Sequence, residues 1–301
     1  MRVLVSGSTG LIGEALVKGL AEAGHIPVRL VRSTPPDRHA SVRWDPAAGT
    51  MDDGALDGID AVIHLAGEGI AERRWTDEQK ARILDSRVGG TTLLADRIAA
   101  AETPPSVFLS GSAIGFYGDR ADETLSESSE PGDGFLAEVV GAWEDATAGV
   151  RNPPTRVAHV RTGIVLSGEG GALAPQLPFF KLGLGGKIGS GTQWWSWISI
   201  DDMVGALIWL LTNDVEGPVN LTAPNPVTNA EFTKALGKVL RRPTLLPIPK
   251  PALWLRLGRE LTQELLYASQ RVEPTVLSDR GYEFIHTDVE GALRAALNRP
   301  A

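Results

Sequence analysis

The feature that most constrains this chain is a run of glycines between its first apolar segment and its first helical pattern. The segment Arg2–Ser6 is short and β-branched, as in a buried strand, and a helical pattern runs from Leu11 to Ala23. The turn between them reads Gly7-Ser8-Thr9-Gly10-Leu11-Ile12-Gly13. A strand, a glycine-rich turn and a helix in this order begin a βαβ unit, which implies a parallel sheet covered by helices.

Each glycine of such a turn has a steric role. The glycines allow the tight turn, the close approach of the backbone to a pyrophosphate, and close packing of helix against strand. The helix N-terminus presents free N–H groups to the phosphates. The spacing is GxxGxxG rather than GxGxxG, and a tight turn without a ligand is the alternative. Its position at residue 7 of an α/β chain favours a dinucleotide, so we predict that Gly7 to Gly13 contact one.

The end of the second predicted strand indicates which dinucleotide binds. Strand Pro27–Val31 is followed by Arg32 and Ser33, and no acidic residue occurs before Asp37. An acidic residue there would accept a hydrogen bond from the ribose of NAD, whereas a guanidinium suits the 2′-phosphate of NADP. A solvated surface arginine is the alternative. We therefore predict that NADP(H) is the cofactor and that Val31, Arg32 and Ser33 contact it.

Strands and helices alternate through the first half of the chain, and the segments become shorter and richer in glycine after about residue 165. Further strands are predicted at Ala61–Leu65, Val107–Ser110, Arg156–Val160 and Gly217–Leu221. Helices are predicted at Thr76–Ala101, Gly134–Ala148, Asp201–Leu211, Thr228–Leu240 and in a tail from Leu253 to Leu297.

The predicted fold class is α/β, a Rossmann-type doubly wound parallel sheet with a smaller C-terminal substrate-side domain. The predicted domains are a nucleotide-binding domain at 1–165, a mixed substrate-side region at 166–250 and a helical C-terminal module at 251–301. The strand at 217–221 is expected to return to the first domain.

Composition excludes several classes of function. The 29 Lys and Arg against 37 Asp and Glu give a net charge of −8, which argues against nucleic acid or an anionic membrane as partner. The chain has no cysteine, so disulfides and thiolate metal sites are excluded, and its five histidines show no metal-ligand spacing. The apolar run at the N-terminus is too short for a signal peptide, so we expect a cytoplasmic protein. A small-molecule substrate is the expected partner, and a homodimer is left open.

Several motifs together resemble a known family. The turn GSTGLIG, the segment DAVIHLAG at Asp60–Gly67 and SAIGFYG at Ser112–Gly118 resemble the extended short-chain dehydrogenase/reductases of the NAD-dependent epimerase/dehydratase class. The blocks AGEGIAERRW, DSRVGGTTLL, GLGGKIGSGTQWWSWISIDD, GPVNLTAPNPVTNAEFTKALG and RRPTLLPIP are similar to one atypical subgroup, the "epimerase family". Members of that subgroup end in a small C-terminal module of unknown function. The resemblance covers essentially the whole chain and implies a Rossmann domain with a smaller C-terminal substrate domain.

The catalytic pair of that family is missing. Its chemistry normally uses Tyr-x-x-x-Lys on a helix, where the tyrosine moves a proton and the lysine lowers its pKa. None of the three tyrosines, Tyr117, Tyr267 and Tyr282, has a lysine four residues later. At the family's position this chain has Phe135 and Val139. Phenylalanine has no proton to transfer, so the ordinary mechanism is not available.

Other residues remain as candidates for the active site. Ser112 stands where the resemblance places a catalytic serine, and Tyr117 is either a substitute acid or a buried packing residue. Glu68, after the strand at Ala61–Leu65, is either a base or a helix-cap acid. The resemblance suggests that Arg82 and Arg87 face the cofactor, although helical arginines are often simply solvated. Beyond the turn and the second strand, the predicted cofactor contacts are Leu65, Ala66, Gly67, Glu68, Arg82, Arg87, Ser110, Arg161 and Gly163.

Two further features have both a functional and a packing interpretation. Trp194, Trp195 and Trp197 lie in a glycine-rich loop, which suits stacking on a flat ligand or packing between domains. Packing is the simpler interpretation. His64 is a lone imidazole in an apolar strand, and we expect it to be packed rather than catalytic.

Two functions are consistent with these observations. The first is an NADP(H)-binding atypical reductase or epimerase-like enzyme with a small polar substrate, of which nucleotide sugars are one example. The second is a non-catalytic NADP(H)-binding sensor or regulatory protein, which the Phe135 and Val139 replacements favour. The presence of both a cofactor half and a substrate half favours the enzyme.

Overall fold

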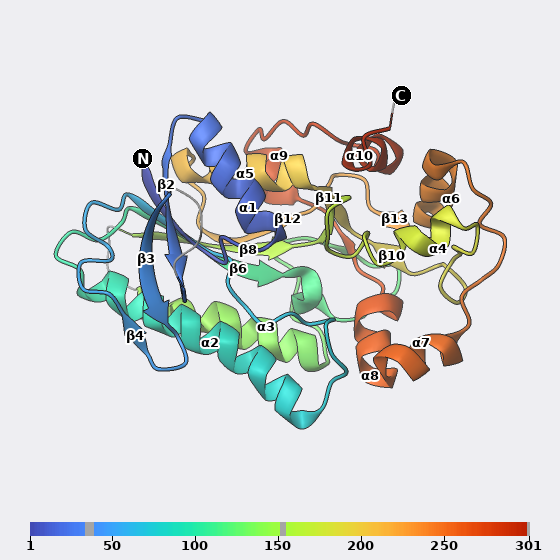
Figure 1. Ribbon diagram of the computed structural model, residues 1–301, viewed down its shortest axis with the longest axis horizontal. Helices are drawn as coiled ribbons and strands as arrows, with labels where there is room; N and C mark the ends of the chain where they lie inside the picture. Colours follow the sequence, from blue (N-terminus) through green and yellow to red (C-terminus); the bar gives the residue numbers. More distant parts are fainter. Residues whose placement is uncertain (34–38, 151–154, 300–301) are drawn as a thin grey trace.

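The structure is a computed structural model and describes residues 1–33, 39–150 and 155–299. Its centre is an eight-stranded sheet with the order β12-β8-β6-β5-β1-β2-β3-β4 (Figure 1). All neighbouring strands are parallel except β3 and β4, which are antiparallel. The strands are β1 Arg2–Ser6, β2 Ile26–Val31, β3 Ala40–Asp45, β4 Thr50–Met51, β5 Ala61–His64, β6 Val107–Ala113, β8 Arg156–Thr162 and β12 Gly217–Leu221. The predicted α/β Rossmann fold is confirmed.

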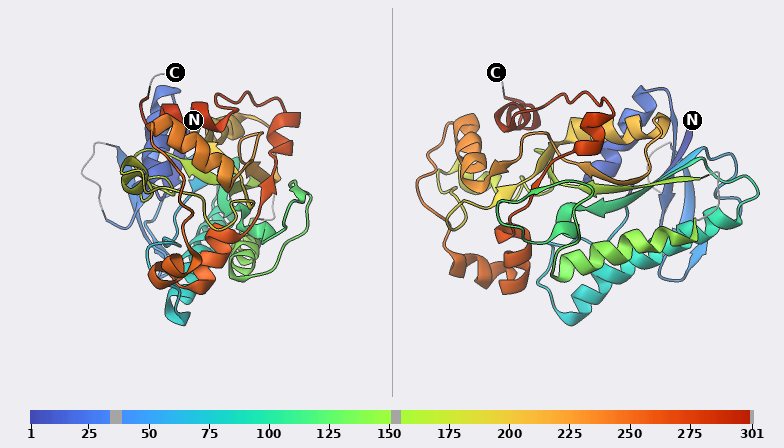
Figure 2. Two further views of the ribbon diagram at one scale, coloured as in Figure 1. Left: turned by 90° about the vertical axis from the view of Figure 1, so that its right-hand side faces the viewer. Right: turned by 180° about the vertical axis from the view of Figure 1, so that it is seen from behind.

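Helices cover both faces of the sheet (Figures 1 and 2). Helices α1 (Leu11–Glu22) and α5 (Ile200–Thr212) lie on one face, and α2 (Asp77–Ala100) and α3 (Phe135–Asp145) lie on the other. Alternate side chains of β1 point to opposite faces of the sheet. Val3 and Val5 pack under α1 and α5, and Leu4 packs under α2. This alternation explains why the strand is a continuous apolar run.

A second core lies beyond the carboxyl ends of the strands. Its buried residues come from segments spread between Leu166 and Leu293, and three of its members are Trp197, Phe232 and Leu293. The elements that contribute to it are β9 Ile164–Leu166, α4 Leu177–Lys181, β10 Trp194–Trp195, β11 Trp197–Ser199, β13 Val227–Thr228, α6 Asn229–Leu240 and α10 Val289–Ala296. Strand β11 pairs with β9, and β10 pairs with β13.

The C-terminal tail is not the continuous helical run predicted from Leu253 to Leu297. Gly258 (φ +90°) ends α7 at Leu257, and an extended segment that includes β14 follows Tyr267. The tail consists of α7 Lys250–Leu257, α8 Arg259–Thr262, a π-helical turn Gln263–Tyr267, β14 Arg271–Val272, α9 Thr275–Asp279 and α10. Strand β14 pairs with β7 (Thr124–Leu125), which joins the tail to the first half of the chain.

Short helical turns Ile114–Tyr117 and Ala146–Gly149 follow β6 and α3. No helix within the described ranges is long and apolar enough to cross a membrane.

Candidate dinucleotide site

The glycine-rich turn lies between β1, β5 and α1, and the three elements are too close for side chains. Gly7 has φ +64°, and a methyl group on it would lie 2.7 Å from the carbonyl carbon of Leu65. A methyl group on Gly13 would overlap the carbonyl oxygen of Gly7. Both glycines are therefore required by the protein's own packing.

Gly10 differs, because no packing contact requires it to be glycine. It is the N-cap of α1, it is exposed, and a methyl group on it would approach only the carbonyl oxygen of Gly7, at 3.4 Å. No side chain caps the helix at this residue. The N-terminus of α1 is thus left open to an external group, as an anion site requires. The neighbouring Ser8 Oγ is buried without a hydrogen-bond partner among the described residues, so this turn also holds an unused polar atom.

Ser6 and His64 fix the ends of β1 and β5 beside this turn. Ser6 Oγ accepts hydrogen bonds from the amides of Leu65 (3.1 Å) and Ala66 (3.3 Å) and lies 2.6 Å from His64 Nδ1. Since the hydroxyl accepts from two amides, its own proton goes to Nδ1, which places the imidazole proton on Nε2. Burial and then the charge of Arg87 lower the pKa of His64 to about 3. The neutral ring packs edge-on against Trp44, so His64 is a packed residue.

The structure places Arg32 and Ser33 in solvent directly after β2, while Val31 is buried. Asp37, the first acidic residue after the strand, lies outside the described residues. One arginine that sequence reasoning missed is Arg29, which is buried within β2 and donates from Nη1 to the carbonyl of Ser8. The sequence feature that could have identified Arg29 is a single charged residue inside an otherwise apolar strand.

At the end of β5, Arg87 and not Arg82 reaches the edge of the sheet. Arg87 Nη1 donates to the carbonyls of Glu68 (3.0 Å) and Ile83 (3.1 Å), and its guanidinium lies 5.0 Å from the centre of the Trp143 ring. Burial lowers the pKa of Arg87 to about 10, so it stays charged at neutral pH. Arg82 is exposed and bonds Gln79 instead.

Glu68 follows Leu65, Ala66 and Gly67 at this edge. Its backbone amide donates to Ser86 Oγ (2.9 Å), and its carboxylate lies 3.5 Å from Gln79 Nε2. A methyl group on Gly67 would lie 3.2 Å from Arg87 Cζ, so glycine lets the guanidinium pack on the strand end.

Ser112, at the end of β6, is joined to a buried ion pair that the sequence did not reveal. Its hydroxyl donates to Glu144 Oε1 at 2.6 Å. Arg161, on β8, donates to both oxygens of the same carboxylate at 2.8 Å, and the two side chains are 4% and 11% exposed. Burial alone would raise the pKa of Glu144, but the hydrogen bonds from Arg161 and Ser112 outweigh it and hold the pKa below its ordinary value. Glu144 is therefore a carboxylate, and the buried Ser112, which is 3% exposed, has only lone pairs left for a further hydrogen bond.

Tyr117 extends this network away from the sheet edge. Its side chain is fully buried, and its hydroxyl donates to Asn220 Oδ1 (2.7 Å) while accepting from Arg161 Nη1 (3.0 Å). Burial raises the pKa of Tyr117 above its ordinary value. Arg161 also lies 3.5 Å from the centre of the Phe116 ring. Tyr117 is thus a buried packing residue, which is the second of the two interpretations drawn from the sequence. Arg161 donates its N–H groups to Glu144 and Tyr117 within this network.

Phe135, in the family's tyrosine position, is half-buried and contacts an aromatic ring and a cation. Its ring centre lies 4.9 Å from that of Trp75 and 4.7 Å from Lys80 Nζ. Glu264 of the C-terminal tail accepts hydrogen bonds from the amides of Phe135 (3.1 Å) and Leu136 (2.8 Å) and so caps α3. The C-terminal tail therefore covers the N-terminus of α3, where the family places its catalytic tyrosine.

The remaining predicted residues pack within the protein. Ser110 Oγ is buried and lies 3.4 Å from the Gly111 carbonyl, and Gly163 donates its amide to Leu221 O. Trp197 is fully buried and Trp195 is 5% exposed, so these two tryptophans belong to the second core.

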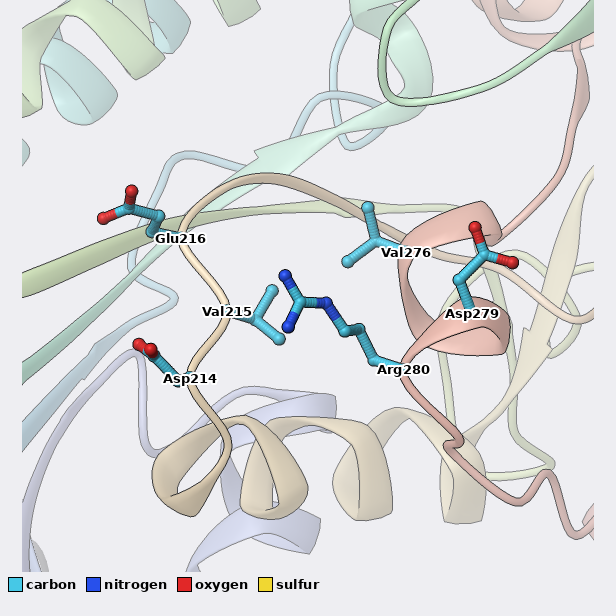
Figure 3. A pocket seen from close by; sticks show the side chains of 6 residues that line it. All are labelled: Asp214, Val215, Glu216, Val276, Asp279 and Arg280. Atoms are coloured by element: carbon cyan, nitrogen blue, oxygen red, sulfur yellow. The ribbon is translucent and has the colours of Figure 1, made fainter.

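A separate cavity of about 380 Å³ lies elsewhere, between β12 and α9 (Figure 3). Its lining residues are Asp214, Val215, Glu216, Val276, Asp279 and Arg280. It opens at the amino end of β12, whereas ligands of open α/β sheets bind at the carboxyl ends of strands. This cavity is therefore not part of the candidate dinucleotide site. No group of His, Cys, Asp and Glu among the described residues is arranged to hold a metal ion.

Comparison with known proteins relates the chain to a defined set of relatives. Residues 3–134 match the model of the NAD dependent epimerase/dehydratase family, and residues 248–296 match a domain of unknown function, DUF1731. An epimerase family protein of Mycobacterium leprae is 40% identical over 300 residues, which cover 99% of this chain and 96% of that protein.

Two crystal structures are similar over nearly the whole chain. The human epimerase family protein SDR39U1 (isoform 2), solved with NADPH, has a TM-score of 0.89 and 36% identity over 99% of this chain and 100% of that one. A nucleoside-diphosphate sugar epimerase of Corynebacterium glutamicum has a TM-score of 0.81 and 39% identity, and the match covers 99% of this chain and 58% of that one.

Proposed function

The chain belongs to the epimerase family, and from this membership together with the geometry of its site we propose that it binds NADP(H) at the turn Gly7–Gly13. The observation that carries the proposal is the uncapped N-terminus of α1, where Gly10 is exposed without any packing reason to be glycine. The pyrophosphate would accept hydrogen bonds from this helix end. Arg32 would contact the 2′-phosphate, because it is an exposed cation at the end of β2. The NADPH in the human relative supports the same choice.

The substitution Arg32→Ala tests the cofactor. We expect it to weaken NADPH and NADP⁺ binding roughly 10- to 100-fold, since a charge-assisted hydrogen bond is lost, and to leave NADH and NAD⁺ unaffected. Isothermal titration with all four dinucleotides measures this. Arg280→Ala is the matched control, because Arg280 is also an exposed arginine but lines the distant cavity. Equal or absent binding of all four dinucleotides by the unmodified protein would contradict the proposal.

We propose further that the protein is an atypical reductase or epimerase-like enzyme for a small polar substrate. The bound cofactor would supply hydride transfer. Ser112 donates its only proton to Glu144, so it can accept but not donate a hydrogen bond at the sheet edge. It therefore suits a substrate hydroxyl rather than a carbonyl oxygen. Nucleotide sugars are such hydroxyl-rich compounds, and the Corynebacterium relative is described as a nucleoside-diphosphate sugar epimerase.

A specific observation favours a second candidate, a non-catalytic NADP(H)-binding protein. Neither tyrosine nor lysine stands at 135 and 139, and the hydroxyl of Tyr117 is buried in the Arg161 network. Turnover separates the two candidates. Either NADP⁺ reduction or redox-neutral interconversion of epimers, assayed with a panel of nucleotide sugars and polyols, supports the enzyme if it disappears in Ser112→Ala. Tight cofactor binding without either reaction supports the sensor.

Restoring the family's residues is expected to fail. Val139 is 2% exposed, so Val139→Lys would bury an ammonium group and cost several kcal/mol of stability. Phe135→Tyr adds only a hydroxyl to a half-buried ring that contacts Trp75 and Lys80. We expect the double variant to melt well below Phe135→Tyr alone and to show no new carbonyl reduction with NADPH. A stable, active double variant would show that the family's catalytic geometry is still present.

A further inference from the structure

Five large apolar side chains are exposed at one end of the molecule. They lie in two segments, residues 179–184, which include the end of α4, and residues 241–246 after α6, which together are called the apolar tip. Their exposed fractions are 46% for Phe179, 74% for Leu182, 57% for Leu184, 87% for Leu245 and 65% for Leu246. Side chains this exposed project outward and do not line a groove.

The two segments form one surface. Arg242 Nε donates to the carbonyl of Lys181 at 2.7 Å, and a methyl group on Gly183 would lie 3.6 Å from Pro243. Gly186 packs directly on the carbonyl of Leu246. Helices α4 and α6 lie at one end of the long axis, opposite β3 and β4 at the other (Figure 1).

Two sequence segments that form this end are basic, unlike the protein as a whole, and among the described residues Glu290 of the neighbouring α10 pairs with only one of their cations, Lys238, at 2.7 Å. Residues 170–200 and 232–259 contain no aspartate or glutamate. They carry nine cations, which are Lys181, Lys187, Lys234, Lys238, Arg241, Arg242, Lys250, Arg256 and Arg259. Since the net charge is −8, the rest of the chain carries −17. The three cations within the apolar tip, Lys181, Arg241 and Arg242, are all exposed.

We propose that the apolar tip docks on an anionic lipid bilayer surface. Exposed leucine and phenylalanine side chains enter the boundary between headgroups and acyl chains, and neighbouring cations contact the anionic headgroups. A bilayer needs no complementary groove, so it accepts loops that project outward. The acidic remainder of the molecule is repelled by the same surface, which orients the apolar tip toward it. The net charge of −8 argues against an anionic membrane as partner of the whole molecule. The two basic segments nevertheless give the apolar tip a local positive charge that an anionic bilayer attracts.

A second copy of the chain fits this end less well. A twofold dimer brings the same patch of both copies together, which would gather Lys181, Arg241 and Arg242 of both copies in one interface. Like charges in direct opposition disfavour an interface. A homodimer through the apolar tip is therefore an outcome of the test rather than the proposal.

Vesicle co-sedimentation of the full chain without cofactor tests the proposal independently of NADP(H) binding. The probes are vesicles of phosphatidylcholine alone and of phosphatidylcholine with roughly a third phosphatidylglycerol. We expect the protein to pellet with the anionic vesicles, to pellet poorly with the neutral ones, and to be released by high salt. The double substitution Leu245→Asp and Leu246→Asp should lower the bound fraction at least about ten-fold, and Lys181→Gln with Arg241→Gln should also lower it.

The matched controls are Ile26→Asp and Ile285→Asp, which change exposed aliphatic residues outside the apolar tip. They should pellet as the unmodified protein does. Absence of pelleting with anionic vesicles, or pelleting unchanged by the Leu245 and Leu246 substitutions, would overturn the proposal. Light scattering adds one more outcome: a dimer that these substitutions convert to a monomer, without vesicle binding, would mean that a second copy covers the apolar tip and that the proposal is wrong.

Discussion

Replacing Arg161 with methionine should lower the free energy of unfolding by about 3–5 kcal/mol, because it leaves a carboxylate buried without its partner. Arg161 binds both oxygens of Glu144 and donates to Tyr117, and its guanidinium stacks on Phe116. Methionine keeps some of the stacking volume but none of the donors. Urea unfolding measures the change as a shift of the midpoint at constant slope.

Two control variants distinguish the cost of breaking this buried ion pair from the cost of removing any arginine that forms an ion pair. Arg120→Met removes a partner of Glu123 at the surface, where the side chains are 25% and 49% exposed, and should cost at most about 1 kcal/mol. Adding Glu144→Leu to Arg161→Met removes both charges and should recover much of the lost stability. If Arg161→Met costs no more than Arg120→Met, the buried pair does not stabilise the fold as described.

The network around Arg161 also shows how far sequence reasoning reaches at this site. The turn Gly7–Gly13 and the strands beside it were predictable because strand, turn and helix are adjacent in the chain. Ser112 and Arg161 were singled out from the sequence, but the carboxylate that joins them is on α3. Nothing local marks Glu144, since an acidic residue on a helix is usually solvated. Only the packing of α3 against β6 and β8 brings the three together.

Long-range contacts also explain what the sequence did not predict in the tail. Glu264 caps α3 from 128–129 residues away, and β14 pairs with β7 across a similar separation. Neither contact leaves a periodic pattern. Strand β3, next to the edge of the sheet, was missed because it is largely exposed, with Trp44 as its one buried residue, so it lacks the apolar run that identified β1. Strand β1, in contrast, carries an apolar run because both of its faces are covered.

Acid should destabilise the protein through His64, and the effect should be nearly as large as that of Arg161→Met. Burial and Arg87 lower the pKa of His64 to about 3, while in the unfolded chain it is about 6.5. Above pH 6.5 the imidazole is neutral in both states and its full contribution is present. As the pH falls from 6.5 toward 3, the unfolded chain binds a proton that the folded protein does not, so stability falls. The loss is about 2 kcal/mol at pH 5 and about 4 kcal/mol at pH 3.

The variant His64→Asn isolates this contribution, because the amide can accept the hydrogen bond from Ser6 but does not titrate. It should be less stable than the unmodified protein at pH 7, and the difference should shrink as the pH is lowered toward 4. His25→Asn removes a half-buried histidine outside this site and should keep the steep acid dependence. Urea unfolding between pH 7 and 4 measures all three proteins. Parallel pH profiles for His64→Asn and the unmodified protein would mean that His64 already takes up its proton in the folded state. The hydrogen bond between Ser6 and Nδ1 would then not fix β1 against β5 as described.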